Sequence, residues 1–243
     1  VRNSGFELAL NWTESLSGGF TYNIGANLAT LKNETRDLYG QPYIDGGTAE
    51  FQQRTRVGDP LFAFFGYETV GVYQNAAQIE ADPVAVALNA ATPGAIVPGD
   101  FMFKDNNGDG VITGEDRVIL GSYLPKFTYG VNLGASYKNF DLSVSLMGQT
   151  GNKILNRKRG EIIWTPDGNM DADLAINRWH GDGTSNKYPS SAGLRKGWNQ
   201  KMSNYFVEDG GFFRIQNVSL AYNFRGTVLG EKWPDARIFV TAE

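Results

Sequence analysis

Three parts of the sequence alternate between apolar and other residues with a period of two, and this pattern most constrains the fold. In the first part, the even-numbered residues from Phe6 to Trp12 are apolar, and the residues between them are polar or small. Because successive side chains of a β-strand point to opposite faces, the pattern predicts a strand with one apolar face. The alternation resumes over residues 20–29 after a short turn at residues 15–19, which predicts a β-hairpin.

The same pattern returns twice further along the chain. Residues 127–137 and 140–146 alternate on either side of a turn at Lys138 and Asn139, which predicts a second hairpin. Each strand has about ten residues, the length that a tilted membrane-spanning strand needs. A third alternating segment covers residues 213–224. Its apolar residues are odd-numbered up to residue 215 and even-numbered from residue 218, so we expect a β-bulge near Gln216 and Asn217.

The two faces of these strands have different chemistry. One face consists mainly of Thr, Asn, Ser and Gly, which suit a water-filled lumen, and the other face is apolar with rings at the strand ends. Such rings are typical of the interfacial girdle of a transmembrane barrel. The rings in question are Trp12, Phe20, Tyr137, Phe140 and Phe224. A soluble β-sandwich produces the same alternation, so the strands alone leave both folds open.

Composition excludes several classes of function. The net charge of -4 and pI of about 5.2 provide no basic surface for phosphates, so we expect no nucleic-acid partner. The chain has no cysteine, which excludes disulfides and thiolate chemistry. It contains no run of about eighteen apolar residues, so it encodes no membrane-spanning helix. Because it starts at Val1 and stops within an apolar run at residues 238–240, we expect a piece of a longer protein.

Two long polar stretches separate the predicted hairpins, at about residues 33–126 and 151–204. Loops of this length are uncommon in compact soluble domains but occur on the extracellular side of outer-membrane barrels. The first stretch contains an alanine-rich segment at residues 78–91, where we expect a short helix with Pro83 near its start.

Residues 105–116 form the one motif that resembles a binding site. Oxygen-bearing side chains occupy positions 1, 3, 5 and 12 of an EF-hand-like loop, with glycine at position 6. The pattern predicts a calcium site whose ligands are Asp105, Asn107, Asp109, the carbonyl of Val111, and Asp116. Asp116 stands where sensor proteins have a bidentate glutamate, so a calmodulin-like switch is not expected. The alternative is an ion-free turn, because Asp, Asn and Gly also form tight turns by themselves.

No catalytic residue is predicted. His180 is the only histidine and has no cysteine or second histidine beside it in the sequence, and no spaced pair of acids is evident. Five rings of the second long stretch could stack on sugars or pack a partner, although packing within the loop is the favoured interpretation. They are Trp164, Trp179, Tyr188, Trp198 and Tyr205.

Several segments together resemble SusC/RagA-type TonB-dependent transporters. They are residues 1–10 (VRNSGFELAL), 57–60 (VGDP), 65–67 (FGY), 71–73 (GVY), 99–112 (GDFMFKDNNGDGVI), 125–133 (PKFTYGVNL), 139–143 (NFDLS) and 207–222 (VEDGGFFRIQNVSLAY). The resemblance covers nearly the whole chain, and its most specific feature is the calcium-like loop followed by PKFTYG.

The resemblance implies an all-β fold for residues 1–243, as the C-terminal part of an antiparallel transmembrane β-barrel of about 22 strands. It implies import of oligosaccharides or peptides across the outer membrane of a Gram-negative bacterium, by gating and without bond chemistry. The implied partners are outer-membrane lipid, a SusD-like surface lipoprotein, and TonB, which would bind a region outside these residues. The alternative is a soluble, calcium-stabilised, carbohydrate-binding β-sandwich module.

Overall fold

The computed structural model describes residues 1–48, 51–156, 172–191, 197–224 and 236–243. Most of its regular structure is β-strand, and no helix in these ranges is long and apolar enough to cross a membrane. The chain divides into two compact units. We name residues 2–33, 124–152 and 210–243 the strand unit, and residues 34–123 and 153–209 the loop unit.

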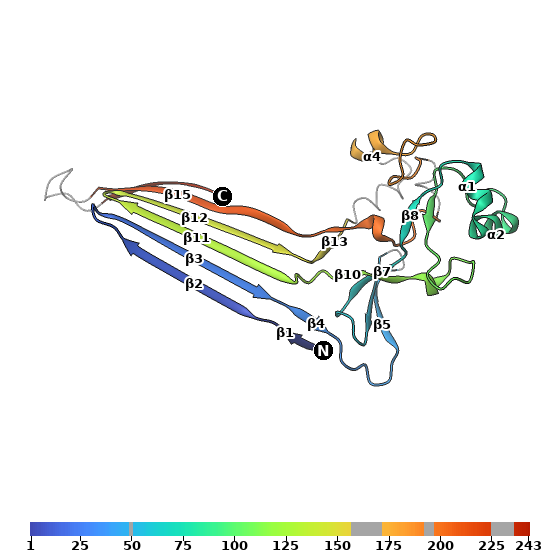
Figure 1. The fold of residues 1–243 in the computed structure, drawn as a ribbon, viewed down its shortest axis with the longest axis horizontal. Helices are drawn as coiled ribbons and strands as arrows, with labels where there is room; N and C mark the ends of the chain where they lie inside the picture. Colours follow the sequence, from blue (N-terminus) through green and yellow to red (C-terminus); the bar gives the residue numbers. More distant parts are fainter. Residues whose placement is uncertain (49–50, 157–171, 192–196, 225–235) are drawn as a thin grey trace. The chain divides into compact units, whose positions relative to one another are not determined.

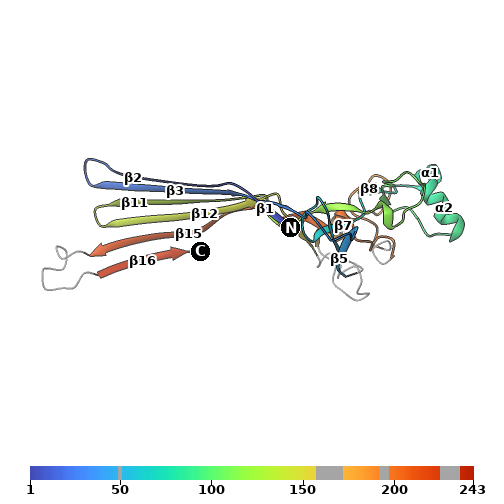
Figure 2. The same cartoon turned by 90° about the horizontal axis from the view of Figure 1, so that it is seen from below.

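The strand unit is built on one six-stranded antiparallel sheet, in the order β16-β15-β12-β11-β3-β2. Figures 1 and 2 show these strands side by side, with short turns joining β2 to β3 and β11 to β12. The strands are β2 (Glu7–Ser15), β3 (Phe20–Thr30), β11 (Phe127–Tyr137), β12 (Phe140–Thr150), β15 (Phe212–Phe224) and β16 (Ala236–Ala242). Two short strands, β1 (Arg2–Ser4) and β4 (Lys32–Glu34), pair with each other. The hairpins predicted from period two are therefore confirmed.

The register of the sheet brings the alternating apolar residues of its strands onto one face, with Phe212 and Phe239 as exceptions on the other face. Leu10 pairs with Ala26, which pairs with Val131, and Val131 in turn pairs with Leu146. The predicted β-bulge preserves this arrangement in β15. Ser145 pairs with Asn217 but Leu146 pairs with Ile215, so Gln216 is the extra residue. Without it, the residues before the bulge would point to the wrong face.

The apolar face of the sheet is exposed. Each of the six strands carries on this face at least one large apolar side chain that is exposed by 38% or more, as for Leu10 at 60%, Leu133 at 38% and Val240 at 72%, and others such as Val131 are partly exposed. Among the described residues of the strand unit, the other paired strands are β1 and β4, of three residues each, too short to cover this face. A soluble sandwich needs this face in its core, so the arrangement disfavours that alternative for the strand unit.

The loop unit has its own secondary structure. A four-stranded sheet has the order β10-β7-β6-β5, and the pairs β8-β9 and β13-β14 are separate. The strands are β5 (Tyr43–Gly47), β6 (Gln52–Arg56), β7 (Ala63–Gly66), β8 (Thr69–Val72), β9 (Phe101–Phe103), β10 (Val118–Gly121), β13 (Lys153–Leu155) and β14 (Val207–Asp209). The helices are α1 (Ala76–Ala81), α2 (Pro83–Ala91), α4 (Ala172–Asn177) and the short 3-10 turns η1 (Gly114–Asp116) and η3 (Asn204–Phe206).

The alanine-rich segment forms two helices where the sequence predicts one. Pro83 is the first residue of α2, as expected, but α1 ends before it. A residue before proline is disfavoured in the α region, and Asp82 has extended angles of φ -99° and ψ 111°. Its carboxylate accepts a hydrogen bond from the Val84 amide at 2.9 Å and so caps α2.

A core of buried rings holds the loop unit together. Tyr67, Phe101, Phe103, Tyr205 and Phe206 are all at least nine-tenths buried and belong to one cluster. The Phe101 and Tyr205 ring centroids lie 4.9 Å apart, although these residues are distant in the sequence. The two long polar stretches thus fold onto each other through apolar burial.

Candidate functional site

The polar face of the sheet carries a repeated pairing of asparagine with glycine. Asn27 lies opposite Gly130, Asn23 opposite Gly134, and Asn11 opposite Gly25. A Cβ at Gly134 would lie 2.0 Å from the Asn23 side-chain oxygen, so this amide lies over the glycine backbone. The pairs form an uncharged surface of amides that can donate and accept hydrogen bonds.

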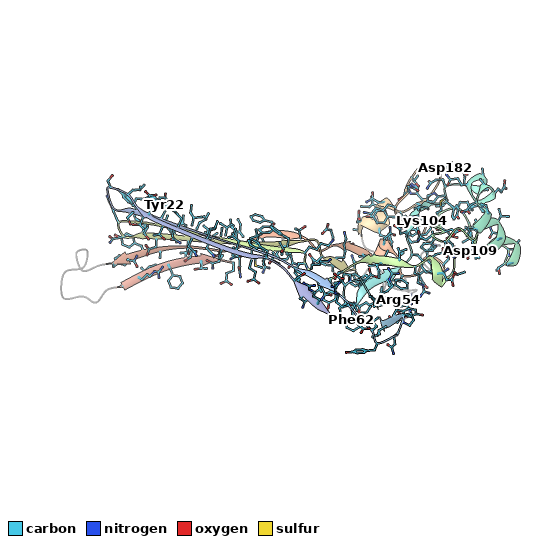
Figure 3. All side chains as sticks on the ribbon, turned by 60° about the horizontal axis from the view of Figure 1, so that its bottom comes forward. Tyr22, Arg54, Phe62, Lys104, Asp109 and Asp182 are labelled. Atoms are coloured by element: carbon cyan, nitrogen blue, oxygen red, sulfur yellow. The ribbon has the colours of Figure 1, made fainter. Side chains whose placement is uncertain are left out.

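The apolar face has rings near the short turns. Phe20 lies 6.2 Å from Tyr22 and 6.4 Å from Tyr137 by ring centroids. The Tyr22 hydroxyl donates to the Glu14 carboxylate at 2.7 Å, and Figure 3 labels Tyr22. Rings with a polar tip and an apolar body suit a boundary between water and hydrocarbon.

The predicted cation loop is held by hydrogen bonds from its own backbone. Asp105 accepts from Gly108 at 2.6 Å and from Gly110 at 2.7 Å. Asn107 accepts from the Asp109 amide at 3.0 Å, and Asp109 accepts from the Val111 amide at 2.9 Å. These contacts place the first three predicted side-chain ligands along one tight turn.

Asp116 closes the loop from the other end. Its carboxylate accepts from the Asn106 amide at 2.9 Å and from the Thr113 amide at 2.7 Å, and the residue is fully buried. The hydrogen bond from Gly110, together with those from other loop amides, holds the pKa of Asp105 below its ordinary value. Asp105 is therefore a charged acceptor at neutral pH.

The fit of this loop to a cation is incomplete. The described residues contain no group of three or more His, Asp or Glu side chains able to hold a metal ion. The predicted ligands also include Asn107 and the Val111 carbonyl, and a carboxylate oxygen that accepts one hydrogen bond retains a second lone pair. The calcium site thus stays a prediction, and the ion-free turn accounts for the hydrogen bonds.

The aromatic residues of the second long stretch mostly pack within the loop unit. Tyr188 and Tyr205 are buried in its core, and Trp179 and Trp198 pack against it. Trp164 lies outside the described residues. His180 is exposed, and its Nδ1 lies 3.0 Å from the Arg178 carbonyl oxygen. Its backbone amide donates to the Thr184 hydroxyl at 3.0 Å, and that hydroxyl donates to the Gly181 carbonyl at 2.6 Å.

Comparisons with known proteins agree with this fold. No model of a protein family matches the chain. The chain is 31% identical over 237 residues to TonB-dependent receptor P3 of Formosa agariphila, and the alignment covers 95% of the chain and 22% of that receptor. It is 31% identical over 246 residues to TonB-dependent receptor P26 of the same organism, with 92% and 22% covered. It is 23% identical over 235 residues to TonB-dependent receptor SusC of Bacteroides thetaiotaomicron, with 93% and 21% covered.

A solved structure of the RagAB peptide transporter superposes with a TM-score of 0.70 at 18% identity, over 98% of this chain and 25% of that one. At this identity the likeness shows a shared fold. The chain belongs to the SusC/RagA type of TonB-dependent receptors. This receptor chain spans about a fifth of the length of the curated relatives it matches.

Some features of the SusC/RagA-type chain were not predicted from its sequence. The asparagine–glycine pairs were recognised only as a polar face, since their partners depend on the register. The pocket beside β8, described below, includes Asn186, Lys187 and Asn204, none of which was singled out. Their contacts join residues more than a hundred positions apart, for which local pattern provides no signal.

Proposed function

We propose that this chain forms part of the barrel wall and part of the extracellular loops of a TonB-dependent importer in the outer membrane of a Gram-negative bacterium. The observation that carries the proposal is the exposed apolar face of the long sheet, with strands of up to 13 residues. A strand of about 9–11 residues crosses the hydrocarbon region when tilted. In this orientation lipid meets the apolar face, and water and cargo meet the polar face.

The polar face supports a role in passage of nutrients. Amide and hydroxyl groups on neighbouring strands can bind sugars or peptides weakly at many positions, as a transport path requires. The proposed cargo is an oligosaccharide or a peptide. The chain's relatives include SusC, and a solved structure with a similar fold is that of the RagAB peptide transporter. The proposed mechanism is gated passage with no bond cleavage, so we expect no enzymatic activity.

The proposed partners are a SusD-like surface lipoprotein at the extracellular mouth and TonB, which would bind the full-length receptor outside these residues. The loop unit has a core of its own, so it can offer a preformed surface to a lipoprotein. Within this proposal, the long stretches at residues 33–126 and 151–204 are extracellular.

Lipid contact can be tested with single cysteines, because the chain has none of its own. Leu133→Cys and Ser143→Cys lie on opposite faces of adjacent strands, at nearly the same height, since Leu133 pairs with Val144. Each variant of the full-length receptor is labelled with a fluorophore and placed in vesicles containing brominated lipids. We expect strong quenching at residue 133 and weak quenching at residue 143. Equal and weak quenching at both positions would contradict the membrane orientation.

Import is tested separately in cells that produce the full-length receptor. We expect uptake of a fluorescent peptide or oligosaccharide library only when TonB is present. Uptake that is unchanged without TonB, or absent for both kinds of cargo, would contradict the import function.

We propose in addition that the loop at residues 105–116 binds calcium through Asp105, Asn107, Asp109, Val111 and Asp116. The loop hydrogen bonds support this proposal because they hold three of these side chains along one turn. A bound ion would add rigidity to this turn and supply no chemistry to cargo.

A further inference from the structure

A pocket in the loop unit is lined by polar and apolar residues, and Lys187 is the one charged residue among those described that line it. Its volume is about 260 Å³. Among the described residues that line it, none carries a carboxylate. The lining residues are Thr69, Val70, Gly71, Phe101, Asn186, Lys187, Asn204 and Tyr205. Such a pocket favours a ligand that brings acceptors or negative charge.

Two asparagines fix the edge of β8 beside this pocket. Asn204 accepts hydrogen bonds from the Thr69 amide at 2.9 Å and from the Thr69 hydroxyl at 2.6 Å. Asn186 accepts from the Val72 amide at 3.0 Å. Because the Asn186 oxygen is used in this way, the orientation of its amide is set and its NH₂ group faces away from the Val72 amide.

Gly71 permits the close approach of Asn186. A Cβ at residue 71 would lie 2.6 Å from the Asn186 side-chain oxygen, closer than carbon and oxygen atoms approach. The wall of the pocket therefore depends on a glycine in β8 as well as on the asparagine. This arrangement preorganises the amide before any ligand arrives.

Lys187 brings a positive charge to the pocket. Its ammonium lies 5.0 Å from the Tyr188 ring, and it forms no ion pair with a carboxylate of the described residues. The acids close in sequence to the lining bind other groups. These pairs are Glu68 with Lys104 at 3.1 Å, Asp100 with Asn199 at 2.8 Å and Asp182 with Asn75 at 2.9 Å, and Figure 3 labels Lys104 and Asp182.

The rings of the pocket favour a peptide over a sugar. A sugar is usually held by an open ring face and by acceptors for its hydroxyl hydrogens. Phe101 and Tyr205 are only 1% and 7% exposed, so neither offers such a face. The lining has no carboxylate acceptor either, whereas a peptide end supplies a carboxylate that needs donors.

We propose that this pocket binds the terminal carboxylate of a peptide cargo. Lys187 pairs with the carboxylate, and the Asn186 NH₂ group donates a hydrogen bond to it. This proposal rests on the proposed import function and selects peptides from its two classes of cargo.

The test compares two forms of one apolar hexapeptide, with a free and with an amidated C-terminus. Calorimetry on the full-length receptor in detergent gives both dissociation constants. We expect amidation to weaken binding about tenfold in the natural protein, a usual loss for one charge-assisted contact. In Lys187→Gln we expect the ratio of the two dissociation constants, amidated over free, to fall to about one. Lys187→Arg should restore most of the tenfold ratio because the charge returns.

Lys138→Asn, in the turn between β11 and β12, is the matched control and keeps the tenfold ratio. The melting temperature of each variant shows whether it is folded. Equal binding of the two peptides by the natural protein, or a tenfold ratio that persists in Lys187→Gln, overturns the proposal. The proposal is also overturned if a trimeric uronate displaces the peptide from the natural protein and no longer binds to Lys187→Gln. The pocket would then bind an acidic glycan. TonB-dependent uptake would still support the import function in each case, so the two proposals fail separately.

Discussion

The ring of Tyr129 on β11 occupies the space above Gly148 on β12. A Cβ at residue 148 would lie 2.5 Å from the Cζ atom and from the hydroxyl oxygen of Tyr129, and 2.6 Å from the backbone oxygen of Phe212. Tyr129 also stacks with Phe213 on β15, with ring centroids 6.3 Å apart and an interplanar angle of 16°. A glycine between two ring-bearing strands therefore lets the rings cover three strands of the apolar face.

Gly148→Ala is expected to destabilise the sheet. The new methyl group would press on the Tyr129 ring and on the backbone oxygen of Phe212, and backbone cannot move aside without loss of strand pairing. We expect a loss of about 1–3 kcal/mol in the free energy of unfolding, measured by urea titration of the receptor in detergent micelles. Gly114→Ala is the control, because no atom lies within 4 Å of its Cβ position. Equal stability of the two variants would contradict the close-approach argument.

Deletion of Gln216 is expected to prevent correct assembly. This residue is the extra one in the bulge, so its loss would turn Phe213 and Ile215 toward the polar face. We expect the deletion variant to lose the heat-dependent gel mobility of an assembled receptor. Gln216→Ala should keep that mobility, since the bulge needs the residue and not its amide. An assembled deletion variant would show that register is set elsewhere.

Arg54→Lys is expected to destabilise the loop unit. The Arg54 guanidinium lies between the Tyr43 and Phe65 rings, 3.6 Å and 3.9 Å from their centroids, and contacts Asp45 through two hydrogen bonds of 2.6 Å and 2.9 Å. Lysine keeps the charge but loses the planar stacking and one hydrogen bond, so we expect a loss of about 1–2 kcal/mol. Thermal unfolding measures it.

A matched control for this prediction is Arg56→Lys, since Arg56 is largely exposed and binds Asp59 through one nitrogen at 2.7 Å. That change should alter stability by less than about 0.5 kcal/mol. A similar effect of both substitutions would mean that the stacking of Arg54 between two rings adds nothing.

Stability should depend on pH through Asp45. The hydrogen bonds from Arg54 hold the pKa of Asp45 below its ordinary value. A lowered pKa in the folded state contributes stability above the ordinary pKa of about 3.9, and this contribution is lost as the pH falls through the lower value. We expect the difference in melting temperature between the natural protein and Asp45→Asn to be constant above about pH 5 and to shrink below it. A difference that stays constant down to about pH 2 would exclude this linkage.

Calcium is expected to raise the melting temperature. With a dissociation constant near 1 mM, as in extracellular modules, about 10 mM calcium stabilises by about 1.4 kcal/mol. This corresponds to a rise of roughly 3–6 °C. The double substitution of Asp105 and Asp109 by Asn should abolish the rise. The same melting temperature in calcium and in EDTA would leave the ion-free turn as the correct interpretation.

The long strands could be predicted because each carries its signal locally. The alternation over residues 127–137 coincides with β11, and the parity change after Ile215 located the bulge. A strand with one apolar face repeats its chemistry every second residue, so about ten residues suffice to recognise it.

The loop unit could not be predicted in the same way. Its strands have three to five residues, too few to show a period. Its core instead joins Phe101 with Tyr205, and Asn204 caps an edge at Thr69. Such contacts depend on how distant parts of the chain meet. The same is true of the pocket, where Asn186 and Lys187 lie beside residues of β8.

The alternation of Asn and Gly on the polar face has a consequence for cargo movement in the proposed orientation. At Asn23 and Gly134, as at Asn27 and Gly130, the amide lies over bare backbone, and the pair itself adds no charge to the wall. A molecule that leaves one of these amides meets other amides and hydroxyl groups of the same face, such as Asn132 and Ser145, which pair across β11 and β12 at about one strand spacing, roughly 4.8 Å. Each step between such groups exchanges one hydrogen bond for another, so cargo would be held longer at the charged residues of the same face, such as Asp141 and Arg214.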